Sequence, residues 1–80
     1  MRFAGIFGFT TAEGRIAEAL VEGQHAKAVA DRFSVSVNTV RTHIKALYTK
    51  TGTRRMGALI ALLSRLAEDA MKQTRLLVNN

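Results

Sequence analysis

From Thr10 to about residue 72, apolar residues recur at the three- and four-residue spacing of amphipathic helices. Only short breaks interrupt this pattern, at Gly23, at residues 34–36 (Ser-Val-Ser) and at Gly52. Glycine adopts the backbone conformation that ends many helices, and serine competes for backbone hydrogen bonds inside a helix. The pattern therefore predicts an all-α fold with four helices, at about residues 11–22, 26–33, 37–50 and 54–72.

Residues that cap helix N-termini precede several of these segments. Thr10 and Glu13 have the spacing of a capping box, in which the hydroxyl and the carboxylate each bind a free backbone N–H group. Ser36 is placed to cap the helix at 37–50, and Thr53 the helix at 54–72. We expect residues 10–72 to form one domain, residues 1–9 to be an N-terminal arm or the remnant of an upstream linker, and residues 73–80 to be a frayed tail.

The chain is short and strongly basic. Its 80 residues lie near the lower limit for an independent core, and the absence of Cys leaves helix packing as the source of stability. Twelve Lys and Arg against six Asp and Glu give a net charge of +6, which is typical of a domain that binds a polyanion. The two His with no Cys do not predict a metal site, and we expect no cofactor. The apolar start is too short for a signal peptide or membrane span, so we expect a cytoplasmic, nucleoid-associated protein.

The positive charge is concentrated around the expected helix at 37–50. No acidic residue occurs between Asp31 and Glu68. Outside its apolar stripe, the helix carries mainly polar and basic residues, among them Asn38, Thr39, Arg41, Thr42, Lys45, Tyr48 and Thr49. A solvated helix normally mixes charges to form pairs along its surface, whereas a face of one sign repels itself until a polyanion binds. A short helix, a tight turn and a longer basic helix together predict a helix-turn-helix that binds duplex DNA.

Several motifs resemble the LuxR-type, or GerE-type, helix-turn-helix of bacterial transcription regulators over about residues 8–67. They are Phe9-Thr10-x-x-Glu13, Gly23, Val29-Ala30, Ser36-x-x-Thr39-Val40-Arg41-x-His43-Ile44 and Lys50-Thr51-Gly52. The resemblance implies a four-helix domain whose third helix enters the major groove of DNA. It also implies that this domain is the C-terminal part of a longer regulator.

The chain departs from the family pattern in three places. The second helix of the family usually begins with Ser or Thr followed three residues later by an acid, where this chain has His25 and Ala28. The segment 51–53 (Thr-Gly-Thr) replaces Leu-Gly-Val, and Phe9 replaces a Leu. None of these positions lies on the base-reading face, so they bear on local stability more than on function.

The resemblance, carried over by position, implies base contacts from Arg41, Thr42 and Lys45. An Arg can donate to guanine O6 and N7, and a Thr methyl can meet the methyl of thymine. Phosphate contacts are expected at the helix starts and at the end of the third helix: Lys27, Ser36, Asn38, Thr39, Tyr48, Lys50, Arg54 and Arg55. Arg54 and Arg55 would open the fourth helix, where they oppose its dipole unless phosphate is their partner.

The segment 54–72 is more apolar than burial of one side requires. We expect a homodimer interface here, because the resembled family often pairs through this helix. The residues expected in it are Leu59, Leu62, Leu63 and Leu66. Two-fold pairing would place two recognition helices about one DNA turn apart. RNA polymerase is a further candidate partner.

Other classes of protein fit the sequence less well. A sigma-factor region-4-like module has a similar helix-turn-helix but would need a surface for RNA polymerase. A helical protein-interaction domain with a basic face would not need the ordered run Thr39–His43.

We do not expect an enzyme, because Glu13 and Glu18 lie five residues apart and so on different sides of a helix. His43 is expected to be a half-buried structural residue bonded across a helix pair, with a phosphate ligand or pH switch as the alternative, and His25 a cap or surface residue.

Overall fold

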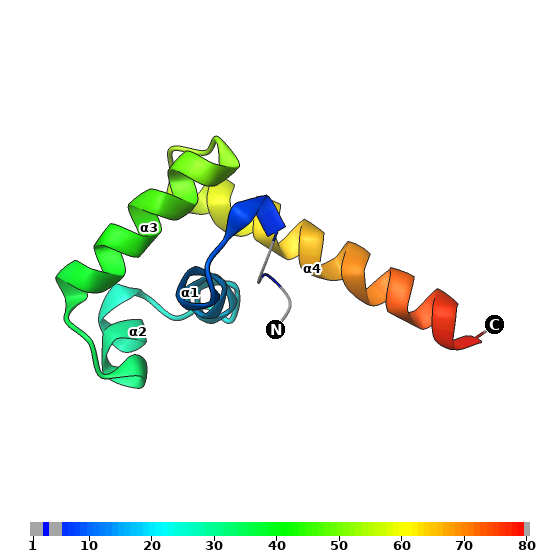
Figure 1. Cartoon of the computed structure of the whole chain (residues 1–80), viewed down its shortest axis with the longest axis horizontal. Helices are drawn as coiled ribbons and strands as arrows, with labels where there is room; N and C mark the ends of the chain where they lie inside the picture. Colours follow the sequence, from blue (N-terminus) through cyan, green and yellow to red (C-terminus); the bar gives the residue numbers. More distant parts are fainter. Residues whose placement is uncertain (1–2, 4–5, 80) are drawn as a thin grey trace.

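The computed structural model describes the backbone of Phe3 and of residues 6–79, and the side chains of Phe3 and of residues 7–68. A 3-10 turn, η1 (Ile6–Gly8), precedes four α-helices (Figure 1). They are α1 (Thr11–Val21), α2 (Ala26–Phe33), α3 (Val37–Thr51) and α4 (Met56–Asn79). The described part of the chain contains no strand. The prediction of an all-α, four-helix fold is confirmed.

The predicted caps of α1 and α3 are present. The N–H of Thr10 donates to Glu13 Oε1 at 2.8 Å, and the N–H of Glu13 donates to Thr10 Oγ1 at 3.1 Å, which completes the capping box. Ser36 Oγ accepts from the N–H of Thr39 at 3.0 Å. The imidazole of His25 caps α2, since its Nδ1 accepts from the N–H of Ala28 at 3.4 Å. A ring nitrogen thus replaces the hydroxyl that is usual in the family.

The first three α-helices end in left-handed backbone or just before it. Gly23, with φ of 93°, follows α1, and Gly52, with φ of 73°, ends α3, so both predicted stops are confirmed. Ser34 ends α2 with φ of 57°, a conformation that is uncommon outside glycine. The N–H of Val35 then donates to the carbonyl of Ala30 at 3.0 Å, which closes the turn that leads into α3.

Both ends of α4 differ from the prediction. Thr53 does not cap this helix, which begins three residues later; its N–H instead closes the end of α3 by donating to the carbonyl of Tyr48 at 3.1 Å. Arg54 and Arg55 therefore lie in the α3–α4 loop, and the helix begins at Met56. At the other end the helix continues to Asn79, through the segment 73–79 that was expected to be a frayed tail. That segment contains no Gly or Pro to end it.

One apolar core joins the four helices and the N-terminal arm. α1 is seen end-on between α3 and α4 in Figure 1, and it contacts all three other helices. Phe3 and Phe9 are both buried, so these two residues of the arm belong to the core. The largest fully buried side chains are Phe3, Leu20, Val29, Val40, Leu47, Leu59 and Leu63. This packing holds α3 along one side of the molecule.

The fourth helix is much longer than the core that it helps to form. Its 24 residues span about 36 Å at the usual rise of an α-helix. Figure 1 shows its later part extending away from the other helices. Within the described part of the chain, no helix combines the length and apolar content that crossing a membrane requires.

Candidate nucleic-acid interface

The face of α3 opposite the core is polar and basic. Val40, Ile44 and Leu47 are buried against the rest of the domain. The exposed side chains of this helix are Asn38, Thr39, Arg41, Thr42, Lys45, Thr49 and Lys50. The three residues expected to contact bases, Arg41, Thr42 and Lys45, therefore all lie at the surface of one helix. Neither Arg41 nor Lys45 forms an ion pair with any residue that the structure describes.

Hydroxyl groups organise the N-terminal end of α3. Ser36 Oγ and Thr39 Oγ1 lie 2.9 Å apart, so the two predicted phosphate contacts share a hydrogen bond at the helix start. Thr42 Oγ1 donates to the carbonyl of Asn38 at 3.0 Å. Because this bond uses the hydroxyl hydrogen of Thr42, the methyl group is the part of the side chain left for an apolar contact.

The C-terminal half of α3 borders an open cavity of about 570 Å³. Lys45, Tyr48 and Arg54 line it, which brings together one predicted base contact and two predicted phosphate contacts. The lining is completed by Thr49, Gly52 and Thr53. Neither threonine was among the predicted contacts with DNA. Thr49 had a sequence signal, because it lies on the exposed polar face of the helix. Thr53 had none, because its position depends on how α3 ends.

Two further predicted phosphate contacts lie outside this cavity. Lys27 is exposed on α2, and Arg55 is exposed in the α3–α4 loop. Neither lines the cavity beside Tyr48. The predicted contacts thus lie on three separate elements: the turn before α3, α3 itself with the loop after it, and α2.

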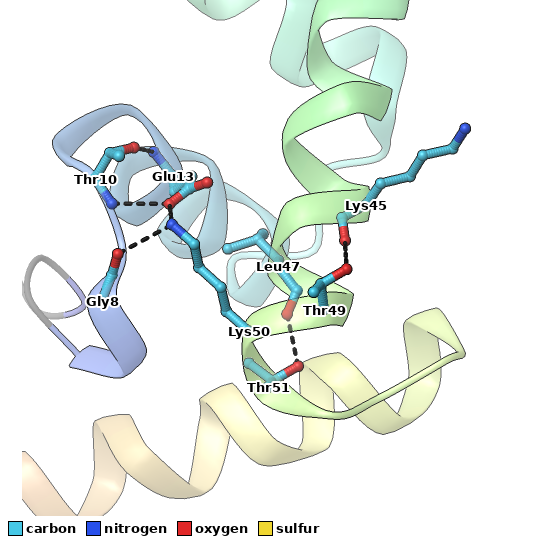
Figure 2. A network of polar contacts seen from close by, with 8 residues as sticks. All are labelled: Gly8, Thr10, Glu13, Lys45, Leu47, Thr49, Lys50 and Thr51. Carbon is cyan, nitrogen blue, oxygen red and sulfur yellow. Dashed lines mark hydrogen bonds and ion pairs between the residues drawn. The ribbon is translucent and has the colours of Figure 1, made fainter.

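Lys50 is placed differently from the other basic residues of α3. Its Nζ donates to Glu13 Oε1 at 2.6 Å and to the carbonyl of Gly8 at 3.0 Å. Figure 2 shows its side chain directed toward α1, while the side chain of Lys45 extends away from the domain. The two lysines are five positions apart, which places them about 140° apart around the helix axis. Lys50 was predicted to contact phosphate, but in the structure its ammonium group has two hydrogen-bond partners within the domain.

Glu13 is the buried partner of this ion pair. Its side chain is 7% exposed, against 32% for that of Lys50. The hydrogen bond from Lys50 and the one from the N–H of Thr10 lower the pKa of Glu13 below its ordinary value of 4.5, against the opposing effect of burial. A carboxyl whose pKa is lowered by folding stabilises the fold above its unfolded pKa, and this contribution is lost as the pH falls through the folded pKa.

Glu13→Gln is expected to lower the free energy of unfolding at neutral pH by about 1–2 kcal/mol. Glutamine preserves the capping box but removes the charge that binds Lys50. The difference between variant and wild type should shrink as the pH falls through the lowered pKa of the wild-type carboxyl, which then becomes protonated. Urea unfolding at several pH values measures this, with the exposed Glu68→Gln as the control. An equal difference at all pH values would contradict the assigned ion pair.

The leucines expected to form a dimer interface fall into two groups. Leu59 and Leu63 are 0% exposed within the monomer, so they belong to its core. Leu66 is partly buried and also packs against the core. Leu62 is half-buried and is not part of the packing around that core in the described residues. The expected interface is therefore corrected for Leu59 and Leu63, because both are fully buried in the monomer's core and not exposed to solvent.

A second cavity, of about 420 Å³, lies beside the start of α3. Its lining includes His43, which is half-buried as expected, and Arg15, which is exposed on α1. The structure shows no hydrogen bond from the His43 ring to another described residue, so the expected bond across the helix pair is absent from that part of the chain. Arg15 had no sequence signal beyond its exposed position on the first helix.

Comparison with known families agrees with this geometry. The family described as "Bacterial regulatory proteins, luxR family" (GerE) matches residues 8–63, which include α1, α2, α3 and the first turns of α4. No curated protein and no solved structure shows significant similarity to the chain. The matched region contains the helix-turn-helix, the basic face of α3 and the cavity beside Tyr48. The chain therefore belongs to the luxR family of bacterial regulatory proteins and carries its GerE-type helix-turn-helix domain.

Proposed function

We propose that this domain binds duplex DNA in a sequence-specific manner, by inserting α3 into the major groove, as the DNA-binding part of a bacterial transcription regulator. The observation that carries the proposal is the exposed face of α3, on which every charged side chain is a cation. The major groove of B-DNA is wide enough for one α-helix. The family to which the chain belongs supports the same function.

Base recognition is assigned to Arg41, Thr42 and Lys45, which are all exposed on α3. The guanidinium of Arg41 forms no ion pair with a described residue, and it can donate two hydrogen bonds to a guanine. Thr42 offers its methyl group, since its hydroxyl is bonded to the carbonyl of Asn38. Lys45, one turn later and exposed, can reach a base or a phosphate.

Phosphate binding is assigned to groups around the edge of that face. The turn and start of α3 contribute Ser36, Asn38 and Thr39, whose polar groups lie at a helix N-terminus, where anions are favoured. The other contacts are Lys27, Tyr48, Arg54 and Arg55. Lys50 is omitted from this set, because its ammonium group already binds Glu13 and Gly8.

Selection of bound sequences from a random duplex pool, at two salt concentrations, tests the proposal. A sequence-specific domain should enrich one short motif at both concentrations, because base contacts distinguish sequences while phosphate contacts set the dependence on salt. Binding that enriches no motif and disappears equally for all duplexes at the higher salt concentration would identify a non-specific polyanion binder and overturn the proposal.

Lys27→Ala is expected to weaken binding to all duplexes by the same factor. A phosphate contact acts through counterion release, so its loss should reduce the slope of log K against log salt by about 0.9. Titrations of the selected duplex and a scrambled duplex over a salt series measure this slope. Arg65→Ala, which removes the same charge from an exposed site on α4, is the control. A change in the preferred base would show that Lys27 reads sequence instead.

Pairing of two copies through α4 is part of the proposed function, in a form narrower than the sequence suggested. The candidate contact is Leu62 with the neighbouring exposed Ala58 and Ala61. Such a pair would bind two half-sites with a fixed spacing.

We propose a nucleoid-associated, cytosolic location, because the cationic face of α3 and the family both favour DNA binding. RNA polymerase is a further candidate partner of the regulator.

A further inference from the structure

Two hydrogen bonds from Lys50 link the end of α3 to the start of α1 and to η1. Lys50 lies in the last turn of α3, Glu13 in the first turn of α1, and Gly8 at the end of η1. The two bonds from Lys50 Nζ span 37 and 42 residues of sequence. They are therefore tertiary contacts that relate the direction of α3 to the body of the domain, as Figure 2 shows.

Glu13, which accepts one of the two bonds from Lys50, is itself held firmly in place. Glu13 Oε1 accepts from Lys50 and from the N–H of Thr10, and the whole residue is only 5% exposed. The capping box also holds the carboxylate against the start of α1. A cation bound to such an anchor constrains the helix from which it comes, whereas an exposed ion pair between two mobile side chains would constrain little.

The same bonds disfavour a phosphate contact by Lys50. To reach DNA, its ammonium group would have to leave Glu13, and a largely buried carboxylate would then lose its cation. Removing one partner of such a pair costs more than the pair contributes. Lys45 has no comparable cost, because it is exposed and forms no ion pair with a described residue.

We propose that Lys50 is a positioning residue, which holds α3 at a fixed direction against α1 and so sets how well the domain discriminates between DNA sequences, without touching DNA itself. Base contacts require a recognition helix to be placed within a fraction of an ångström, while phosphate contacts tolerate more movement. Loss of the two bonds from Lys50 should therefore reduce discrimination between DNA sequences more than it reduces overall affinity for DNA. This inference rests on the proposed function for its effect on DNA, but the effect on the direction of α3 does not.

The experiment compares Lys50→Met, Glu13→Gln and the double variant, with Lys45→Met as the matched control for loss of a lysine from the same helix. Residual dipolar couplings of backbone amides, measured without DNA, report the direction of α3 relative to α1. Binding is then measured over a salt series with two probes, the duplex recovered from the random pool and a scrambled duplex of the same length. If Lys50→Met fails to fold, Lys50→Gln takes its place, since it removes the charge but keeps a donor for Gly8.

A positioning role predicts that Lys50→Met and Glu13→Gln both rotate α3 and both reduce discrimination between the probes by about tenfold, with the double variant no worse than either. The salt slope on the scrambled duplex should stay at the wild-type value. Lys45→Met should leave the direction of α3 unchanged and reduce that slope by about 0.9.

Other results would overturn the inference. A phosphate contact by Lys50 predicts that Lys50→Met reduces the salt slope as Lys45→Met does, while Glu13→Gln, which frees the lysine, preserves or strengthens binding. A contribution to stability alone predicts unchanged dipolar couplings and unchanged discrimination in the folded variants. If the wild type does not distinguish the two probes, the proposed function fails, and the dipolar couplings still decide whether Lys50 sets the direction of α3.

Discussion

Leu63→Ala is expected to lower the free energy of unfolding by about 2–5 kcal/mol, the range for removing a large aliphatic side chain from a packed core. Leu63 is 0% exposed and lies where α4 packs against the other helices. The loss is large for a domain of 80 residues, whose total stability is expected at the low end of the usual range of about 5–15 kcal/mol. Urea unfolding should therefore show a much lower midpoint, at every protein concentration.

Leu62, the preceding residue, provides the matched control. It is half-buried and outside the packing around the core in the described residues, so Leu62→Ala should cost less than about 1 kcal/mol. A cost equal to that of Leu63→Ala would contradict the assignment of the two leucines to different surfaces of α4.

Leu62→Lys extends this comparison to pairing. If two copies meet through this part of α4, the change should leave the monomer folded but weaken binding to a duplex with two half-sites far more than to one with a single half-site. Sedimentation of the protein with and without the two-site duplex measures the pairing. A wild type that stays monomeric on the two-site duplex at saturation would contradict the dimer.

Arg41→Ala is expected to relax the preference at one base pair of the selected motif, with a loss of about 1–3 kcal/mol of discrimination. Arg41 is exposed on α3 and forms no ion pair with a described residue, so its guanidinium is available to a guanine. The loss corresponds to a factor of about 5 to 150 in relative affinity. Repeating the selection with the variant measures it position by position.

The comparison with Lys27→Ala separates the two kinds of contact. Arg41→Ala should change the motif, while Lys27→Ala should preserve the motif and change the salt slope. An identical motif for Arg41→Ala and wild type would show that Arg41 does not read a base. Arg41→Lys adds a further control, because it keeps the charge but not the two-pronged geometry that suits guanine.

Local sequence was sufficient for most of the secondary structure. Three of the predicted features act within a few residues of the chain: the capping box of Thr10 and Glu13, the stop at Gly23 and the cap at Ser36. Over so short a distance, the spacing of residues along a helix fixes which groups meet. The start of α4 was predicted wrongly, because Thr53 had two local roles open to it. The end of α3 uses its N–H and hydroxyl, and only the folded chain shows this.

The four-helix pattern, the family and the single sign of charge on α3 can be predicted from the chain alone, because helical period and charge are properties of neighbouring residues. Which side of each helix meets the core depends on how the helices pack. Lys50 and Lys45 are both basic residues of one helix, but packing against α1 gives Lys50 a buried carboxylate and leaves Lys45 in solvent. Leu63 and Leu62 differ in the same way on α4. Lys50 and Glu13 are 37 residues apart in the chain, and a contact over that separation depends on how the helices pack. The spacing of neighbouring residues does not record this packing.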